Sequence, residues 1–262
     1  MDTVTKRGAL AVHFHILGPV EARVDGVALP LGGTKPRTVL AALLLARGQV
    51  VRDSRLSHLL WRDQPPVTAN AQIYTYISRL RKIAENHVFI TRHGQGYALT
   101  LGHACFDHQD FEQLARRGRE ELAAGRFDQA SSHLRAALAL WHGPALTDVT
   151  EYLLDEELGG LEEGRVAALE GRIDADLALD RHESVVAELV RLVGQYPLRE
   201  RFRAQLMTAL HRCGRQAEAL AVYHEGRKLL ADELGVDPDE RLRATYHSIL
   251  AGRSHTPTLI RA

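Results

Sequence analysis

Cysteine is scarce in this sequence. The 262 residues include two cysteines, Cys105 and Cys213. Two thiols are too few for a disulfide framework or a four-thiolate zinc site, which points to a reducing compartment such as the cytoplasm. Long apolar runs are absent as well: none reaches the roughly 18 residues of a membrane-spanning helix. No membrane span is therefore expected.

Catalytic and nucleotide-binding motifs are also missing. The chain has no nucleophile elbow, no HExxH helix and no obvious carboxylate pair. It has no G-x-x-x-x-G-K-[ST] loop either, so neither a nucleotide switch nor a cofactor is expected. These absences disfavour an enzyme, which is the main alternative class of protein.

One tight group of metal-ligating residue types occurs, in the segment HACFDH from His103 to His108. No second set of ligands has a matching spacing, so a metal site is not expected. Asp107 is instead predicted to cap a helix that begins at Gln109 or Asp110.

The formal net charge is zero because a basic first part of the chain balances an acidic second part. Residues 1–100 contain 13 Lys/Arg and 6 Asp/Glu, a net charge of +7, and the remaining residues contain 20 and 27, a net charge of −7. A basic half joined to an acidic half is typical of a nucleic-acid-binding domain fused to a different module.

The first hundred residues predict strands, then helices, then a hairpin. Residues 14–33 contain three short alternating runs, which predict an antiparallel meander. A helix follows, capped by Thr34 and ended by Gly48. Val50 and Val51 suggest a short strand.

Two further helices and the hairpin complete this half. The second helix is expected to be capped by Asp53 or Ser54, and the third to run from Val67 or Thr68 to about Glu85. The segments VFITR and YALTL, around the turn HGQG, predict the hairpin.

The stretch IYTYISRLRK, from Ile73 to Lys82, looks locally like a strand because it alternates β-branched and aromatic residues. A strand would bury Arg79 beside Ile77 without a partner. A helix instead places Ile73, Ile77 and Leu80 on one core stripe. Its opposite face then carries small polar and basic residues: Thr68, Ala71, Thr75, Ser78, Arg79 and Lys82. We therefore predict a helix.

Such a helix, followed by a hairpin, fits the major groove of DNA, because small side chains permit close approach while Arg and Lys bind bases and phosphates. Tyr74 and Arg81 lie at the edges of this face. Other candidate contacts are Arg92, His93 and Gln95 at the hairpin tip, and Lys35, Arg37 and Arg52 near helix starts. From the residues alone, an ordinary solvated surface remains the alternative.

The second half predicts a repeated helical unit. Related phrases begin at Gly125, Asp180 and Gly214, and the distance from Arg181 to Arg215 is the 34 residues of a tetratricopeptide repeat. The distance from Arg126 to Arg181 is 55, so about 21 residues are inserted. Small residues, Ala130 and Ala219, recur where helices meet, and Pro144, Pro197 and Pro238 follow the second helix of each pair. A tetratricopeptide-like array is favoured over a generic helical bundle.

At these residues the sequence resembles the Streptomyces antibiotic regulatory protein family. The resemblance rests on LGPVEARVDGVALPLGGTKPRTVLAALLLA, WRDQPP, NAQIYTYISRLRKI and HGQGYALT, and on the helical repeats, and it covers roughly residues 12–251. It implies an α+β OmpR-like winged helix-turn-helix in residues 1–102, an all-α tetratricopeptide-like activation domain in residues 103–252, and a tail in residues 253–262.

The resemblance also implies a function. The family activates secondary-metabolite gene clusters by binding direct repeats near promoters, as a homodimer on DNA, and by recruiting RNA polymerase holoenzyme. The family's base-reading positions match Thr75, Arg79 and Arg81, and its wing contact falls on Arg92 or His93. Such a protein is expected in the cytoplasm, associated with the nucleoid when bound to DNA. The alternative is a tetratricopeptide-like scaffold without specific DNA recognition.

Overall fold

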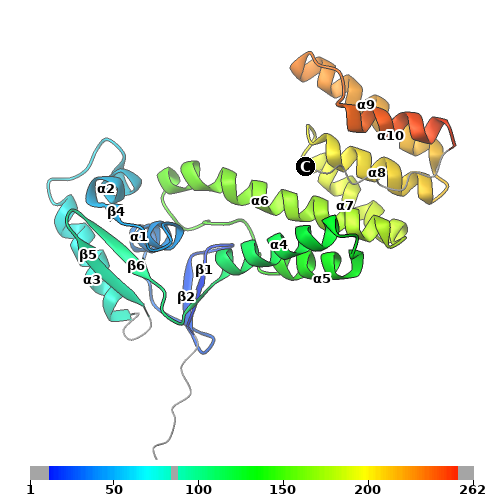
Figure 1. Cartoon of the computed structure of the whole chain (residues 1–262). Helices are drawn as coiled ribbons and strands as arrows, with labels where there is room; N and C mark the ends of the chain where they lie inside the picture. Colours follow the sequence, from blue (N-terminus) through cyan, green and yellow to red (C-terminus); the bar gives the residue numbers. More distant parts are fainter. Residues whose placement is uncertain (1–11, 84–87, 253–262) are drawn as a thin grey trace, which may run out of the picture. The chain divides into compact units, whose positions relative to one another are not determined.

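The computed structural model describes residues 12–83 and 88–252 (Figure 1). Its contacts form two compact units, which are described separately. The first comprises Met1–Gln113 and Ala137–Arg165, and the second Leu114–Ala136 and Val166–Ala262. The domain boundary expected near residue 102 stays a prediction.

The first unit opens with a four-stranded sheet. Strands β1 (Val12–His15), β2 (Glu21–Val24) and β3 (Val27–Ala28) form the predicted antiparallel meander. Strand β7 (Cys105–Phe106) was not predicted; it pairs in parallel with β1 and gives the order β3-β2-β1-β7. Two residues are too short a run to show any periodicity, so only the partner strand reveals β7.

The second sheet and three helices form a winged helix-turn-helix, which confirms the predicted fold class. The helices are α1 (Thr34–Leu45), α2 (Asp53–Trp61) and α3 (Ala69–Ile83), and α1 contacts both others. Strands β4 (Val51–Arg52), β5 (Phe89–His93) and β6 (Gly96–Thr100) have the order β4-β6-β5. His93 pairs with Gly96, so the predicted hairpin closes with a two-residue turn.

Two of the predicted helix caps are wrong. Helix α1 begins at Thr34 itself, after Gly33, and no side chain caps it. Helix α2 likewise begins at Asp53 without a side-chain cap. The Asp53 carboxylate is engaged elsewhere, since it accepts hydrogen bonds from Arg92 at 2.8 and 2.6 Å. Helix α3 starts at Ala69, one or two residues after the expected Val67 or Thr68, and its expected end near Glu85 lies outside the described residues.

Asp107 does not cap a later helix, because α4 (Asp107–Ala123) begins at this residue. Its buried carboxylate instead accepts from the backbone N–H groups of Ile16 and Leu17, each at 3.0 Å. These groups follow the last residue of β1, where the sheet offers them no acceptor. A buried N–H without a partner is costly, so the carboxylate stabilises this turn.

Residues 139–150, which belong to the first unit, pack against its other elements. The N–H groups of His142 and Leu146 donate to the carbonyls of Leu17 and Gly18, each at 2.8 Å. The Thr150 hydroxyl donates to the carbonyl of Leu59 in α2 at 2.6 Å. Much of the insertion expected between the first two helical repeats therefore stabilises the winged helix.

The helical half of the chain contains three helix pairs, as predicted, and most of their residues lie in the second unit. The pairs are α4 with α5 (Phe127–Leu138), α6 (Glu151–Ala178) with α7 (His182–Gln195), and α8 (Glu200–Arg212) with α9 (Gln216–Leu234); α10 (Glu240–Leu250) follows. Each pair turns through a residue of positive φ: Gly125 at 74°, Asp180 at 57° and Gly214 at 76°. The next residue in each turn, always an arginine, donates its N–H to the carbonyl five residues earlier. The similar sequence segments therefore recur because each of them forms the same helix-end motif.

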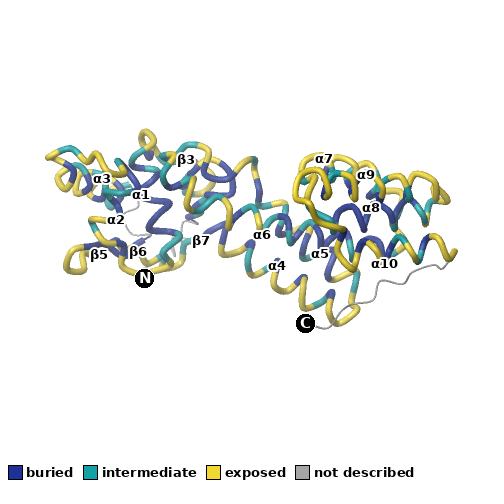
Figure 2. The backbone as a smooth tube through the Cα atoms, turned by 90° about the horizontal axis from the view of Figure 1, so that it is seen from above, coloured by how far each residue is buried: buried dark blue, intermediate teal, exposed yellow. Residues whose placement is uncertain are grey.

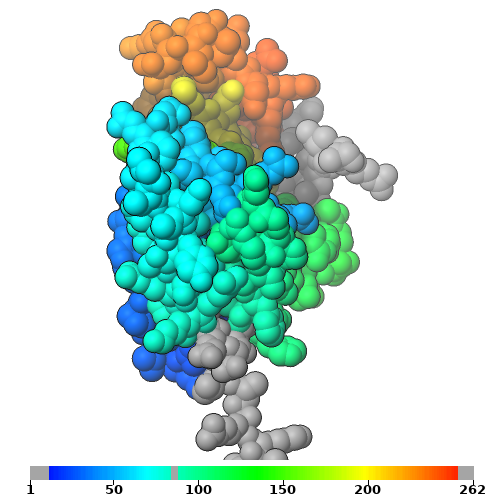
Figure 3. Space-filling model, turned by 90° about the vertical axis from the view of Figure 1, so that its left-hand side faces the viewer, coloured from blue at the N-terminus to red at the C-terminus, as the bar shows by residue number. Residues whose placement is uncertain are grey.

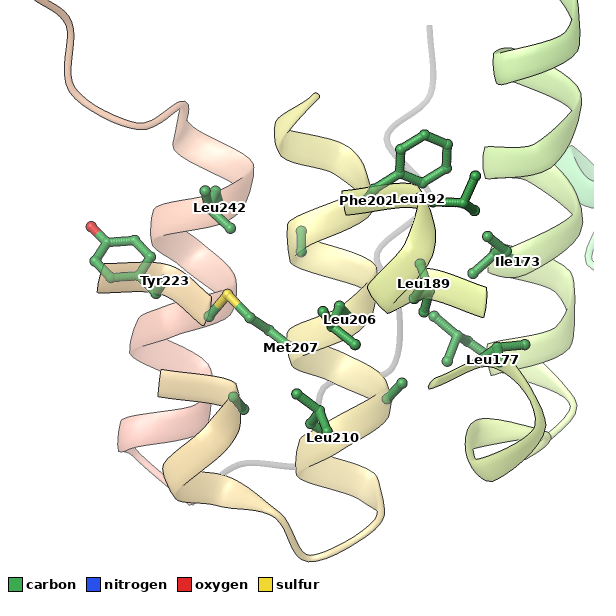
Figure 4. Close-up of a cluster of buried hydrophobic side chains, with 14 of the residues drawn as sticks. Ile173, Leu177, Leu189, Leu192, Phe202, Leu206, Met207, Leu210, Tyr223 and Leu242 are labelled. Atoms are coloured by element: carbon green, nitrogen blue, oxygen red, sulfur yellow. The ribbon is translucent and has the colours of Figure 1, made fainter. Parts of the chain in front are cut away.

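The core of the second unit surrounds α8, which Figure 2 colours dark blue over most of its length. Phe202, Leu206 and Met207 of α8 pack with residues of α6, α7, α9 and α10 (Figure 4). Ala130 and Ala219 are fully buried, as their small size predicted.

Candidate nucleic-acid interface

Helix α3 has one buried and one exposed face. Ile73, Ile77 and Leu80 are at most 2% exposed, which confirms the core stripe. The predicted outer residues are all exposed: Thr68, Ala71, Thr75, Ser78, Arg79 and Lys82. Figure 3 shows α3, in cyan, beside the hairpin, in green, on the face turned toward the viewer. The stretch that resembled a strand is therefore an amphipathic helix with a small, basic outer face.

The two basic residues of this face are available for a ligand. Neither Arg79 nor Lys82 has a hydrogen bond or an ion pair within the described part of the chain. The Thr75 hydroxyl donates to the carbonyl of Ala71 at 2.8 Å, which leaves its oxygen free to accept. The Thr68 hydroxyl accepts from Gln72 at 3.0 Å. The outer face thus combines free cations with short polar side chains.

A second edge of α3 faces the hairpin. Asn70, Tyr74 and Arg81 lie about 60 to 100° around the helix from Ile73. Tyr74 is 62% exposed. Arg81 is half-buried, because its Nε donates to the carbonyl of Ile90 at 2.8 Å. Arg81 therefore joins α3 to β5, in addition to any contact with a ligand.

Three interactions hold the hairpin against the start of α2. The Asp53 N–H donates to the carbonyl of Gln95 at 2.8 Å, and Arg52 pairs with Gly96 between β4 and β6. Arg92 forms the bidentate ion pair with Asp53 and lies 4.5 Å from the ring centre of Tyr97. The hydrogen bond to Asp53 raises the pKa of Arg92, so the guanidinium stays charged. Only glycine fits at Gly96, since a Cβ would lie 2.6 Å from the carbonyl oxygen of Val51.

Two hollows lie between α3 and the hairpin. One, of about 360 Å³, is lined by Asp53, Asn70, Tyr74, Arg81, Arg92 and Tyr97. The other, of about 510 Å³, is lined by Ser78, Arg81, Lys82, Val88, Phe89, Ile90 and Thr91. Arg81 lines both hollows, and each has residues of α3 and of the hairpin in its lining.

The tip of the hairpin carries the predicted polar residues. Arg92, His93 and Gln95 are all exposed, and the His93 ring lies 2.8 Å from the Thr91 hydroxyl. The Arg92 guanidinium, however, is turned back onto Asp53 and the Gly94 carbonyl. At the tip itself, His93 and Gln95 are exposed, and neither side chain bonds to another element within the described residues.

The predicted residues near helix starts do not join this surface. The Lys35 ammonium lies 4.8 Å from the ring centre of Trp61. Arg37 donates to the carbonyls of Gly32 and Val20 and pairs with Asp148, so it holds the first sheet to the 139–150 segment. Arg52 lines a separate hollow, with Arg55, Leu153 and Glu157 among its other residues.

Sequence reasoning missed Asn70, Asp53 and Tyr97 as members of the surface. The helical wheel would have found Asn70, which lies one turn before Tyr74. Asp53 and Tyr97 enter the surface through strand pairing and an ion pair, which leave no local pattern in the sequence.

Within residues 12–83 and 88–252, no three His, Cys, Asp or Glu side chains are placed to hold a metal ion. Over the same residues, none of the helices has the length and apolarity needed to cross a membrane.

Two family models match the chain. The model "Transcriptional regulatory protein, C terminal" matches residues 31–99, and "Bacterial transcriptional activator domain" matches residues 106–250. The regulatory protein DnrI of Streptomyces peucetius is 38% identical over 251 residues, which cover 91% of this chain and 92% of DnrI. The regulatory protein AfsR of Streptomyces coelicolor is 43% identical over 241 residues. That alignment covers 92% of this chain but 24% of AfsR, so the chain spans about a quarter of that relative.

A solved structure is also similar. Mycobacterium tuberculosis EmbR, in complex with a low-affinity phosphopeptide, superimposes with a TM-score of 0.87 at 35% sequence identity. The superposition covers 93% of this chain and 66% of that chain.

Proposed function

Because the chain belongs to the Streptomyces antibiotic regulatory protein family of transcriptional regulators, we propose that it is a sequence-specific DNA-binding activator of a secondary-metabolite (antibiotic) gene cluster. It binds direct repeats near a promoter as a pair of protomers and recruits RNA polymerase holoenzyme. The observation that carries the proposal is the outer face of α3, which combines small polar side chains with two free cations beside the hairpin.

The proposed docking places α3 in the major groove. Thr75, Ser78 and Arg79 lie at the centre of the outer face and contact base edges, where Arg can bond guanine in a bidentate manner. Lys82 and Thr68 contact the phosphate backbone. Tyr74 and Asn70, on the edge that faces the hairpin, contact the flanking backbone or bases. Arg81 contributes charge while it holds β5.

The hairpin acts as the wing, and His93 and Gln95 are the residues that enter the neighbouring minor groove. The ion pair with Asp53 supports a different role for Arg92, which positions the wing. Lys35, Arg37 and Arg52 lie outside the proposed contact surface. The strongest support for this is at Arg37, which makes three contacts with the protein itself.

A salt series tests DNA binding. We expect the affinity for promoter DNA from the chain's own gene cluster to fall steeply between 50 and 200 mM salt. A protein that makes about 6 to 10 phosphate contacts loses on the order of 10³ to 10⁵ in affinity over this range. A footprint of the chain alone on the same DNA should show two protected direct repeats. When polymerase is added, the protected region should become longer. A flat salt dependence with no protected repeat would refute the proposal.

A scaffold that binds other proteins through its helical repeats is the second candidate. The net charge of +7 in residues 1–100 and the free cations of α3 have no role in that model. The scaffold hypothesis predicts that the chain binds promoter DNA no more tightly than random DNA. The same titration, carried out with both DNAs, measures the two affinities.

A further inference from the structure

A groove of about 490 Å³ crosses the second unit between α7, α8 and α9. Its floor is formed by Arg203, Leu206 and Leu210 of α8, one stripe along that helix. Its walls include Val190 of α7 and Val222 of α9. Val190 is 55% exposed, so this wall of the groove offers an apolar side chain to a partner.

Arg203 makes the groove chemically distinctive. The residue is 6% exposed, yet its guanidinium bonds only the carbonyl of Pro197, through Nε at 3.3 Å and Nη2 at 3.1 Å. Throughout the described residues, no carboxylate lies within ion-pair distance of it. Burial lowers the pKa of Arg203, and the charges of Glu225, which also lines the groove, and Glu200 partly offset this effect from beyond ion-pair distance.

Arg172, the other buried arginine among the described residues of this unit, has the carboxylate partners that Arg203 lacks. Arg172 is 4% exposed and pairs with two carboxylates, Asp176 at 3.1 Å and Glu188 at 2.6 Å. A buried charge is costly to hold without such partners. The fold nevertheless makes room for Arg203, since a Cβ at Gly226 of α9 would lie 2.7 Å from its Cδ.

We propose that this groove binds a segment of a partner protein that places a carboxylate on Arg203 and apolar side chains against Leu206, Leu210 and Val190. The carboxylate would supply the missing charged hydrogen bonds, and the apolar contacts would cover the exposed valine. An amphipathic helix laid in a groove has this combination of groups. Arg215, at another part of the wall, already pairs with Glu218 at 2.7 Å, so Arg203 determines the position of the acidic residue.

This binding site uses none of the residues assigned to DNA. The two proposals can therefore fail independently of each other.

The probe is a panel of amphipathic, Leu- and Ala-rich peptides in which a single Glu is moved through each position, matched by a panel with Gln. Binding to the isotope-labelled full chain is followed by NMR, including the Nε–Hε signal of Arg203. We expect at least one Glu peptide to bind about tenfold more tightly than its Gln partner and to shift the signals of Val190, Leu206 and Arg203.

Variants test the assignment. Arg203→Met should abolish the preference for Glu, and it should keep the melting temperature, because an apolar side chain often replaces a buried ion without loss of stability. Val190→Lys should weaken every peptide. Val236→Lys, at an exposed valine outside the groove, is the matched control and should change nothing.

Should Arg203→Met unfold the chain, Val190→Lys and the Glu-to-Gln comparison still decide the question. Equal binding of Glu and Gln peptides, binding that Val190→Lys leaves intact, or no binding by any peptide would each overturn the proposal.

Discussion

Residues of one type, two positions apart on α3, have different surroundings. Arg79 is exposed and has no partner within the described residues, whereas Arg81 donates to the Ile90 carbonyl and lies 5.9 Å from the ring centre of Tyr97. A guanidinium without a partner loses nothing within the protein when it binds a base. Arg79 is therefore the stronger candidate for base recognition, and Arg81 combines a structural role with any DNA contact.

Alanine substitutions separate base reading from phosphate binding. Arg79→Ala should cost about 1 to 3 kcal/mol and relax the base preference at one position of the operator. Lys82→Ala should weaken binding similarly on all sequences and reduce the salt slope by about 0.9, since one phosphate contact is lost. Titrations against the operator and its single-base variants, at fixed salt, measure both effects. Small and equal effects of the two substitutions would show that the outer face of α3 does not enter the groove.

At the scale of elements, the wing and α2 form one assembly. The Asp53 N–H, the β4–β6 pairing and the Asp53–Arg92 ion pair all join the hairpin to the first residues of α2. The carboxylate also neutralises Arg92, so the pair adds no net charge at the base of the wing. In this geometry the Arg92 guanidinium is bound to Asp53, although Arg92 lies close to the hairpin tip.

Substitutions of this pair test the role of Arg92. Arg92→Gln should leave the salt slope of DNA binding unchanged, because the guanidinium is already neutralised by Asp53. Asp53→Asn should raise the slope by up to about 0.9, since it releases a cation at the wing. Binding to promoter DNA across a salt series gives both slopes. If Arg92→Gln instead lowered the slope by about 0.9, Arg92 would exchange Asp53 for a phosphate upon binding.

At the scale of the whole molecule, the compact units do not follow the chain in order. Residues 137–165 belong with the winged helix, which they contact through Leu146, Asp148 and Thr150. Asp107, at the start of α4, accepts three buried hydrogen bonds from two N–H groups of the turn after β1. The DNA-binding unit thus requires residues that belong in sequence to the helical half.

A fragment that ends at residue 102 should therefore be less stable than the same residues in the full chain. It lacks β7, Asp107 and the 139–150 segment, whose hydrogen bonds are each worth about 0.5 to 1.5 kcal/mol. We expect a loss on the order of 3 kcal/mol or more in the free energy of opening, measured by hydrogen exchange at the amides of α1 and α3.

Asp107→Asn in the full chain is the matching point variant. It should reproduce about 1 to 3 kcal/mol of that loss, because a neutral amide forms weaker hydrogen bonds than a carboxylate and would replace Oδ1, which also accepts from the buried N–H of Ile16, with an N–H₂ donor. Equal protection of α1 and α3 in the fragment and the full chain would contradict the role assigned to residues 103–165.

The sequence by itself determined the helices, the hairpin, the repeats and the outward face of α3. These follow from local rules: the period of apolar residues, the glycines at turns, and the recurrence of one helix-end motif. Local rules also account for the errors, since Thr34 and Asp53 have the residue types of helix caps but do not cap.

The tertiary structure alone decided which polar groups are already engaged. Asp107, Arg37, Arg81 and Arg92 each bind a partner from another element, and Arg203 is buried without a carboxylate. The physical reason is that a charged side chain takes whichever partner the packing brings within reach, and residues distant in sequence supply most of these partners.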